Sequence, residues 1–99
     1  MEIKVIIDDA NQLEIAFFGK LDTLGVGEVE TKVYALLNGV SKQVYFDFAE
    51  VSYLSSMGIR LIISAMRMTK RAECSLLIIN ANESVRKVLE MINMDEVIR

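Results

Sequence analysis

The first part of the chain holds two short segments in which apolar and polar residues largely alternate. Residues Glu2 to Asp8 and Gln12 to Phe18 are rich in β-branched or aromatic side chains, and a polar segment of three residues separates them. A period of two places every second side chain on the same face of a strand. The pattern therefore predicts a β-hairpin. One face of its second strand carries Leu13, Ile15 and Phe17.

The spacing of apolar residues then changes to three and four, which predicts a helix from about Thr23 to Asn38 that ends at Gly39. The same spacing recurs from about residue 57 to 71, and again from the capping residue Asn82 to about residue 92. Two β-rich segments, Val44 to Phe48 and Ser75 to Ile79, separate these helices. The second is almost continuously apolar, which is typical of a central strand covered on both faces. The expected core residues of the first helix are Val26, Val29, Val33, Leu36 and Leu37.

Strands alternate with helices from residue 44 onward, which favours right-handed crossovers and a largely parallel sheet. The expected fold is α/β: a mixed sheet of four or five strands with an N-terminal antiparallel hairpin and three helices above it. A chain of 99 residues accommodates one domain, residues 1–99, and buries roughly 65% of its unfolded surface. Hydrophobic residues make up 53% and charged residues 25%, which is an ordinary globular composition.

Several classes of function become improbable on composition. The net charge is −3, so direct binding of nucleic acid is not expected, although Arg60, Arg67 and Arg71 could form a local basic patch. The chain has one cysteine and no histidine, which removes disulfides, the usual zinc sites and His-based catalysis. The start lacks the features of a signal peptide, and no segment has eighteen uninterrupted apolar residues, so we expect a cytoplasmic protein without membrane insertion.

The helix after Ser56 separates into three stripes when its residues are placed about 100° apart. The expected core face holds Ile59, Ile62, Ile63 and Met66. A basic and polar stripe holds Arg60, Ser64, Arg67 and Arg71. A second apolar stripe, roughly opposite the core face, holds Met57, Leu61, Ala65 and Met68. It is more than a core needs: either neighbouring helices cover it, or its flexible methionines bind a partner. The predicted partner-binding residues are Met57, Arg60, Leu61, Ala65 and Met68.

Two serines, Ser55 and Ser56, stand where this helix is expected to begin. The first backbone N–H groups of a helix lack internal partners, and the helix dipole favours negative charge there. A serine at this point can cap the helix when free, and it can carry a phosphate when modified. Capping alone is the simpler interpretation, since serines cap very many helices.

The serine loop and its surroundings resemble the STAS family, the bacterial anti-sigma-factor antagonists and their relatives. The family pattern is a strand, an acidic or polar turn, an aromatic or apolar pair, then Asp-Ser-(Ser/Thr/Ala)-Gly and an apolar helix. Further likeness lies in Gly19-Lys-Leu-Asp22 and in a final helix of the type Ser84-Val-Arg-Lys-Val-Leu89. The resemblance implies that Ser56 is the phosphoacceptor, supported by Asp22, Ser55 and Gly58. Ser55 replaces the family aspartate, and Met57 replaces a small residue.

The resemblance implies a protein that works by binding, without catalysis and without a cofactor. The unmodified domain would bind an anti-sigma factor that is also a serine kinase, the kinase would phosphorylate the serine, and a phosphatase would reset it. Three alternatives remain open. The phosphorylation site could have decayed, the domain could be a STAS subunit of a membrane transport complex, or a serine hydrolase could use Ser55 or Ser56, which the missing histidine disfavours.

Two further features are not expected to form sites. Gly25 and Gly27 lack the other residues of a phosphate-binding loop, and we interpret them as a loose helix start. The acidic pairs at residues 8–9 and 95–96 have no third ligand nearby in the sequence, so no metal site is expected.

Overall fold

The computed structural model describes residues 1–99. Four strands form one sheet in the order β1-β2-β3-β4, with β1 antiparallel to β2 and the other pairs parallel. The predicted fold class and hairpin are confirmed, and the sheet has the smaller of the two predicted strand numbers. The elements are β1 (Glu2–Asp8), β2 (Gln12–Leu21), α1 (Thr23–Leu37), β3 (Gln43–Leu54), α2 (Ser56–Arg71), β4 (Leu76–Ile79), α3 (Glu83–Met91) and the 3₁₀ turn η1 (Asp95–Val97).

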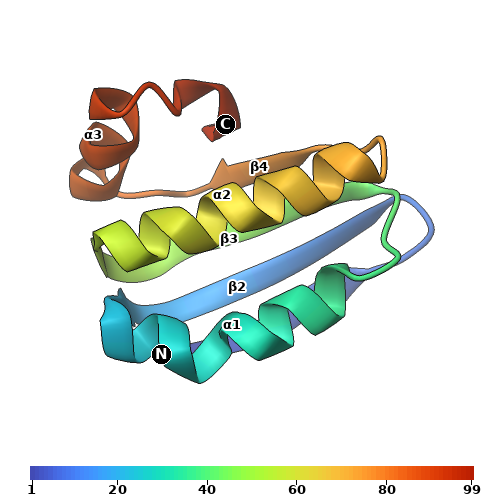
Figure 1. Cartoon of the computed structure of the whole chain (residues 1–99), viewed down its shortest axis with the longest axis horizontal. Coiled ribbons are helices and arrows are strands. Elements are labelled where there is room, and N and C mark those ends of the chain that lie inside the picture. Colours follow the sequence, from blue (N-terminus) through green and yellow to red (C-terminus); the bar gives the residue numbers. More distant parts are fainter.

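Figure 1 shows α1 and α2 side by side over one face of the sheet, with α3 on the far side of α2 from α1. The core lies between this helical layer and the strands. Phe17, Phe46 and Phe48 are almost completely buried there, and their ring centroids lie 4.8 to 6.3 Å apart. Such aromatic contacts stabilise a core beyond the area they bury. The alternation in β2 and β3 thus directs one face of each strand into a single core.

The prediction that residues 75–79 form a central strand is wrong. β4 is the last strand of the sheet, and only Leu76 and Ile78 are buried, while the alternate residues are half-buried. Ile78 forms an isolated parallel bridge with Ile98, and the backbone N–H of Arg99 donates to the Ile78 carbonyl at 3.0 Å. The C-terminal segment therefore covers the open edge of β4, which reduces the hazard of an unpaired edge strand.

Cys74, the only cysteine, precedes β4 and lies at the opposite end of α2 from the serines. Its thiol contacts the Val40 carbonyl at 3.7 Å, and burial raises the pKa of the Cys74 thiol. A raised pKa keeps the thiol protonated near neutral pH, so Cys74 is a weak nucleophile.

Candidate functional site

Two helices begin next to each other at one end of the sheet (Figure 1). Leu21 of β2 and Leu54 of β3 are paired across the parallel strands, and α1 and α2 each begin two residues later. Asp22 caps α1 by accepting the Gly25 N–H at 2.7 Å. Because the N-termini of both helices lie at this end of the sheet, their free N–H groups and their dipoles together create a local positive potential.

Ser55 forms hydrogen bonds that connect the start of α2 to the end of β2. Its hydroxyl donates to the Leu21 carbonyl at 2.7 Å and accepts the Gly58 N–H at 3.3 Å, so Ser55 is the N-cap of α2. The backbone N–H of Ser55 donates to the same Leu21 carbonyl at 2.9 Å. An aspartate at this position could still cap the helix, but an ionised carboxylate could not donate to Leu21.

Ser56 differs from Ser55 in each of these respects. It is the first residue of α2, its side chain is exposed, and its hydroxyl makes no hydrogen bond to the protein. A phosphate on Ser56 would lie at a helix N-terminus, where anions are favoured. Arg60 is exposed four residues later, on the same side of the helix, and it forms no ion pair. Ser56 can therefore accept a group without loss of an existing contact.

The glycines at both helix starts permit a close approach to the end of β2. A Cβ atom on Gly58 would lie 2.7 Å from the Leu21 carbonyl oxygen, and one on Gly25 would lie 1.9 Å from the Lys20 carbonyl oxygen. Real Cβ atoms do not approach that closely, so only glycine fits. The start of α2 therefore requires glycine at position 58, and the interpretation of Gly25 as part of a loose helix start is wrong.

The prediction that the second apolar stripe of α2 is exposed to a partner is wrong for its two central residues. Leu61 is 2% exposed and Ala65 is fully buried, because α1 packs against this side of α2. Both residues are core, so they cannot contact a partner in the folded domain. Of the other predicted partner residues, Met57 and Met68 are half-buried and Arg60 is exposed. Three residues expected in the core, Ile59, Ile63 and Met66, are only partly buried.

Exposed apolar side chains near the serines lie instead on residues that the helical pattern did not single out. Tyr53, at the end of β3, is 53% exposed, and Leu24, in the first turn of α1, is 74% exposed. Each lies two residues from a capping residue, Ser55 and Asp22 respectively. No signal in the sequence singles them out, since Leu54, directly beside Ser55, is buried.

The sequence profile of the STAS domain matches residues 3–99, which is nearly the whole chain. The chain belongs to the STAS domain family. The serine loop, where Ser55 caps α2 and Ser56 is its first residue, is one of the segments that carry the family resemblance in the sequence. None of the proteins with curated function matches the chain significantly.

Solved structures share the fold of this STAS domain. The anti-sigma-factor antagonist SpoIIAA in its unphosphorylated form has a TM-score of 0.84 at 19% identity, with 99% of this chain and 86% of that chain covered. SpoIIAA of Bacillus in the phosphorylated form gives 0.77 at 19% identity, with 99% and 89% covered. The murine anion transporter Slc26a9 gives 0.76 at 15% identity, with 91% of this chain but 15% of that chain covered. In this STAS domain, no helix meets the length and hydropathy needed to span a bilayer.

Replacing Ser55 by alanine is expected to lower the free energy of unfolding by about 1 to 2 kcal/mol, since the helix loses its cap and the Leu21 carbonyl loses a donor. Ser56→Ala is the matched control, and its expected effect is within about 0.5 kcal/mol because the Ser56 hydroxyl has no partner in the protein. Urea unfolding followed by circular dichroism measures both. Equal losses in the two variants would contradict the assignment of Ser55 as the cap.

Proposed function

We propose that this STAS domain is a partner-switching regulator that binds an anti-sigma factor with serine kinase activity and is released when Ser56 is phosphorylated. The observation that carries the proposal is the difference between the two serines: the Ser55 hydroxyl is engaged, whereas the Ser56 hydroxyl is exposed and free. The domain acts by binding and supplies no catalysis of its own. A phosphatase returns it to the binding state.

The charge of the phosphate provides the physical basis of release. A phosphoserine carries roughly −1.5 to −2 charges at neutral pH. Leu24, Tyr53 and Met57 place apolar surface at the same end of the molecule as Ser56. A partner that covers these side chains must also desolvate the phosphate, which is costly unless it offers matching cations.

The domain itself tolerates the phosphate. The α2 N-terminus favours an anion, and Arg60 lies one turn further along the same helix, within the spacing at which side chains interact. The hydrogen bonds of Ser55 do not involve Ser56, so the loop keeps its anchors. Modification therefore changes the charge of the binding surface while the fold remains.

The test is phosphorylation by the cognate kinase with ATP, followed by intact mass and site mapping. We expect one phosphate on the wild type and on Ser55→Ala, and none on Ser56→Ala. Ser56→Asp should weaken the partner complex, although one carboxylate reproduces a phosphate only partly. Ser55→Asp should leave Ser56 as the site, and it should raise the rate if the carboxylate of the family pattern is what limits phosphorylation.

Two results would contradict this proposal in different ways. Phosphate on Ser55 alone would mean that the register of the acceptor is wrong. No phosphate with a kinase shown to be active on another substrate would favour a domain that binds without covalent control.

A subunit of a membrane transport complex is the second candidate, and the shared fold with part of the anion transporter Slc26a9 supports it. The test is to purify this chain from native membranes and to identify the untagged proteins that are recovered with it. Stoichiometric recovery of a transporter ATPase with this chain, and no anti-sigma factor, would favour this candidate over the first.

A further inference from the structure

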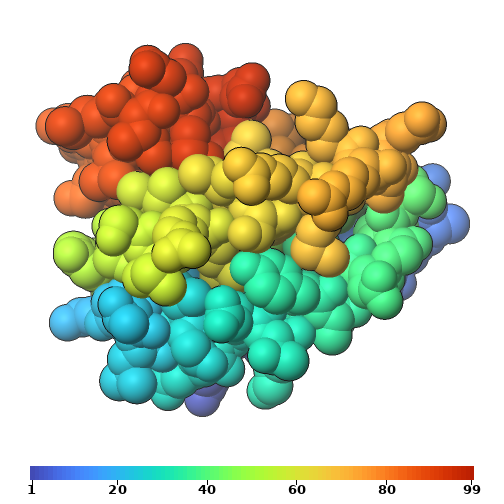
Figure 2. Space-filling model, viewed as in Figure 1, coloured from blue at the N-terminus to red at the C-terminus, as the bar shows by residue number.

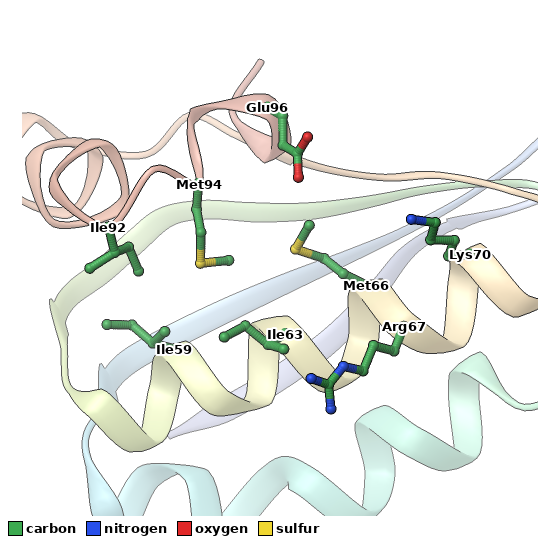
Figure 3. Close-up of a pocket in the computed structure, with 8 residues that line it drawn as sticks. All are labelled: Ile59, Ile63, Met66, Arg67, Lys70, Ile92, Met94 and Glu96. Atoms are coloured by element: carbon green, nitrogen blue, oxygen red, sulfur yellow. The ribbon is translucent and has the colours of Figure 1, made fainter.

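An apolar groove of about 460 Å³ runs between α2 and the segment that follows α3, residues 92–99, here called the C-terminal segment. Figure 3 shows side chains entering it from both walls, and Figure 2 shows that α2 and the C-terminal segment are adjoining parts of one exposed face. The groove lies on the side of α2 opposite to α1. It is lined by Ile59, Ile63, Met66, Arg67 and Lys70 from α2, and by Ile92, Met94 and Glu96 from the C-terminal segment.

Apolar side chains also protrude beside this groove. Met91, the last residue of α3, is 82% exposed, and Ile92 on the rim is 41% exposed. An exposed methionine next to an apolar groove leaves apolar surface in contact with water in a monomer. In an interface, the flexible methionine side chain supplies a projection and the groove supplies a cavity that can receive it. A twofold interface uses the same patch on both subunits, so it needs these two features side by side.

The two walls of the groove carry opposite charges. Arg67 and Lys70 lie on the α2 wall, and Glu96 lies on the C-terminal wall, with Asp95 exposed beside it. None of the four forms an ion pair within the chain. A twofold axis along the groove, parallel to α2, would place the basic wall of one copy over the acidic wall of the other. The patch is thus complementary to itself in charge as well as in shape.

We propose that the occupant of this groove is a second copy of the chain, in a twofold dimer. Met91 of each copy covers the apolar part of the other groove, and Lys70 of each copy faces Glu96 of the other. An acyl chain with an anionic head would also fit an apolar groove near Arg67 and Lys70, but Glu96 on the opposite wall opposes it. The dimer uses both charges.

The size of the face limits the strength of this dimer. The face that holds the groove measures at most 32 by 26 Å, and the groove with its rim occupies only part of it. The dimer would therefore bury less than the roughly 800 Å² per partner found in standard interfaces. We therefore expect a dissociation constant on the order of 10 to 100 μM. Sedimentation equilibrium of the wild type over a concentration series should show this reversible dimer.

Surface variants then test which face is used. Met91→Asp is expected to weaken the dimer at least about tenfold, because it places a charge in the apolar contact. Leu24→Asp is the matched control: Leu24 is 74% exposed on α1, away from the groove, and the dimer should be unchanged. Both variants should keep the wild-type melting temperature, since neither side chain is buried.

Charge reversal gives the most specific test. Lys70→Glu places carboxylates opposite each other where Lys70 of one copy faces Glu96 of the other, and Glu96→Lys places two ammonium groups there, so each variant alone should dimerise about tenfold more weakly. Mixed together, they should form a heterodimer that neither forms alone. A wild type that stays monomeric at about 500 μM, a dimer insensitive to Met91→Asp, or a mixture that shows no heterodimer would each overturn the proposal. A monomer that binds fatty-acid anions would assign the groove to an amphiphile instead.

Discussion

Leu61→Asp is expected to unfold the domain. Leu61 is 2% exposed and lies within the main hydrophobic cluster, on the side of α2 that packs against α1. A carboxylate at this position would be buried without a partner, and the loss of the leucine side chain alone removes several kcal/mol. Domains of this size have only about 5 to 15 kcal/mol of total stability. Far-UV circular dichroism and a one-dimensional NMR spectrum of the purified variant should show loss of the folded state at 25 °C.

Arg60→Asp is the matched control for this experiment. Arg60 is adjacent in sequence and exposed, and an acidic residue near the start of a helix is tolerated by the helix dipole. Its melting temperature should stay within a few degrees of the wild type. If Leu61→Asp melted at the wild-type temperature as well, Leu61 would belong to the surface and the packing of α1 on α2 would be wrong.

Gly25→Ala is expected to lower the free energy of unfolding by about 2 to 4 kcal/mol. The added Cβ would lie 1.9 Å from the Lys20 carbonyl oxygen and 3.2 Å from the Asp22 carboxylate that caps α1. The obstacle is backbone, so no side-chain rotation can relieve it. The start of α1 must move away from β2, which also disturbs the Asp22 cap.

Gly27 provides an internal comparison for this substitution. It lies two residues further along α1, and a Cβ atom there would meet nothing within 4 Å. Gly27→Ala should therefore stabilise the domain by about 0.5 to 1 kcal/mol through helix propensity. Chemical unfolding of both variants measures the contrast. Stabilisation by both substitutions would mean that α1 begins further from β2 than the structure places it.

The features that could be predicted from the sequence depend on short-range pattern. The strands and helices follow from the periods of apolar residues, and their alternation predicted the mixed sheet. The cap at Asn82 was predicted, and Ser55 was one of two serines expected to cap α2, because a cap is a contact between a side chain and a backbone N–H three residues later. The location of Ser56 at the start of α2 follows from the same local rule.

The features that were wrong depend on which elements become neighbours. A helical wheel identifies two apolar stripes on α2, but it cannot tell which stripe α1 will cover, and the structure buries Leu61 rather than Ile63. The apolar run before Ile79 resembles a central strand, yet its outer edge is covered by Ile98, twenty residues after Ile78 in sequence. The groove depends on the same C-terminal segment. No local pattern predicts such distant contacts.

The double attachment of Ser55 to the Leu21 carbonyl has a consequence for how the proposed switch responds to its surroundings. The loop is anchored whether or not Ser56 carries a phosphate, so the two states differ in charge and hardly in shape. A difference of charge is screened by ions, with a Debye length of about 8 Å at physiological ionic strength and about 3 Å at 1 M. The contrast between the two states therefore shrinks as salt is added, and the ionic composition of the cell becomes part of the regulation.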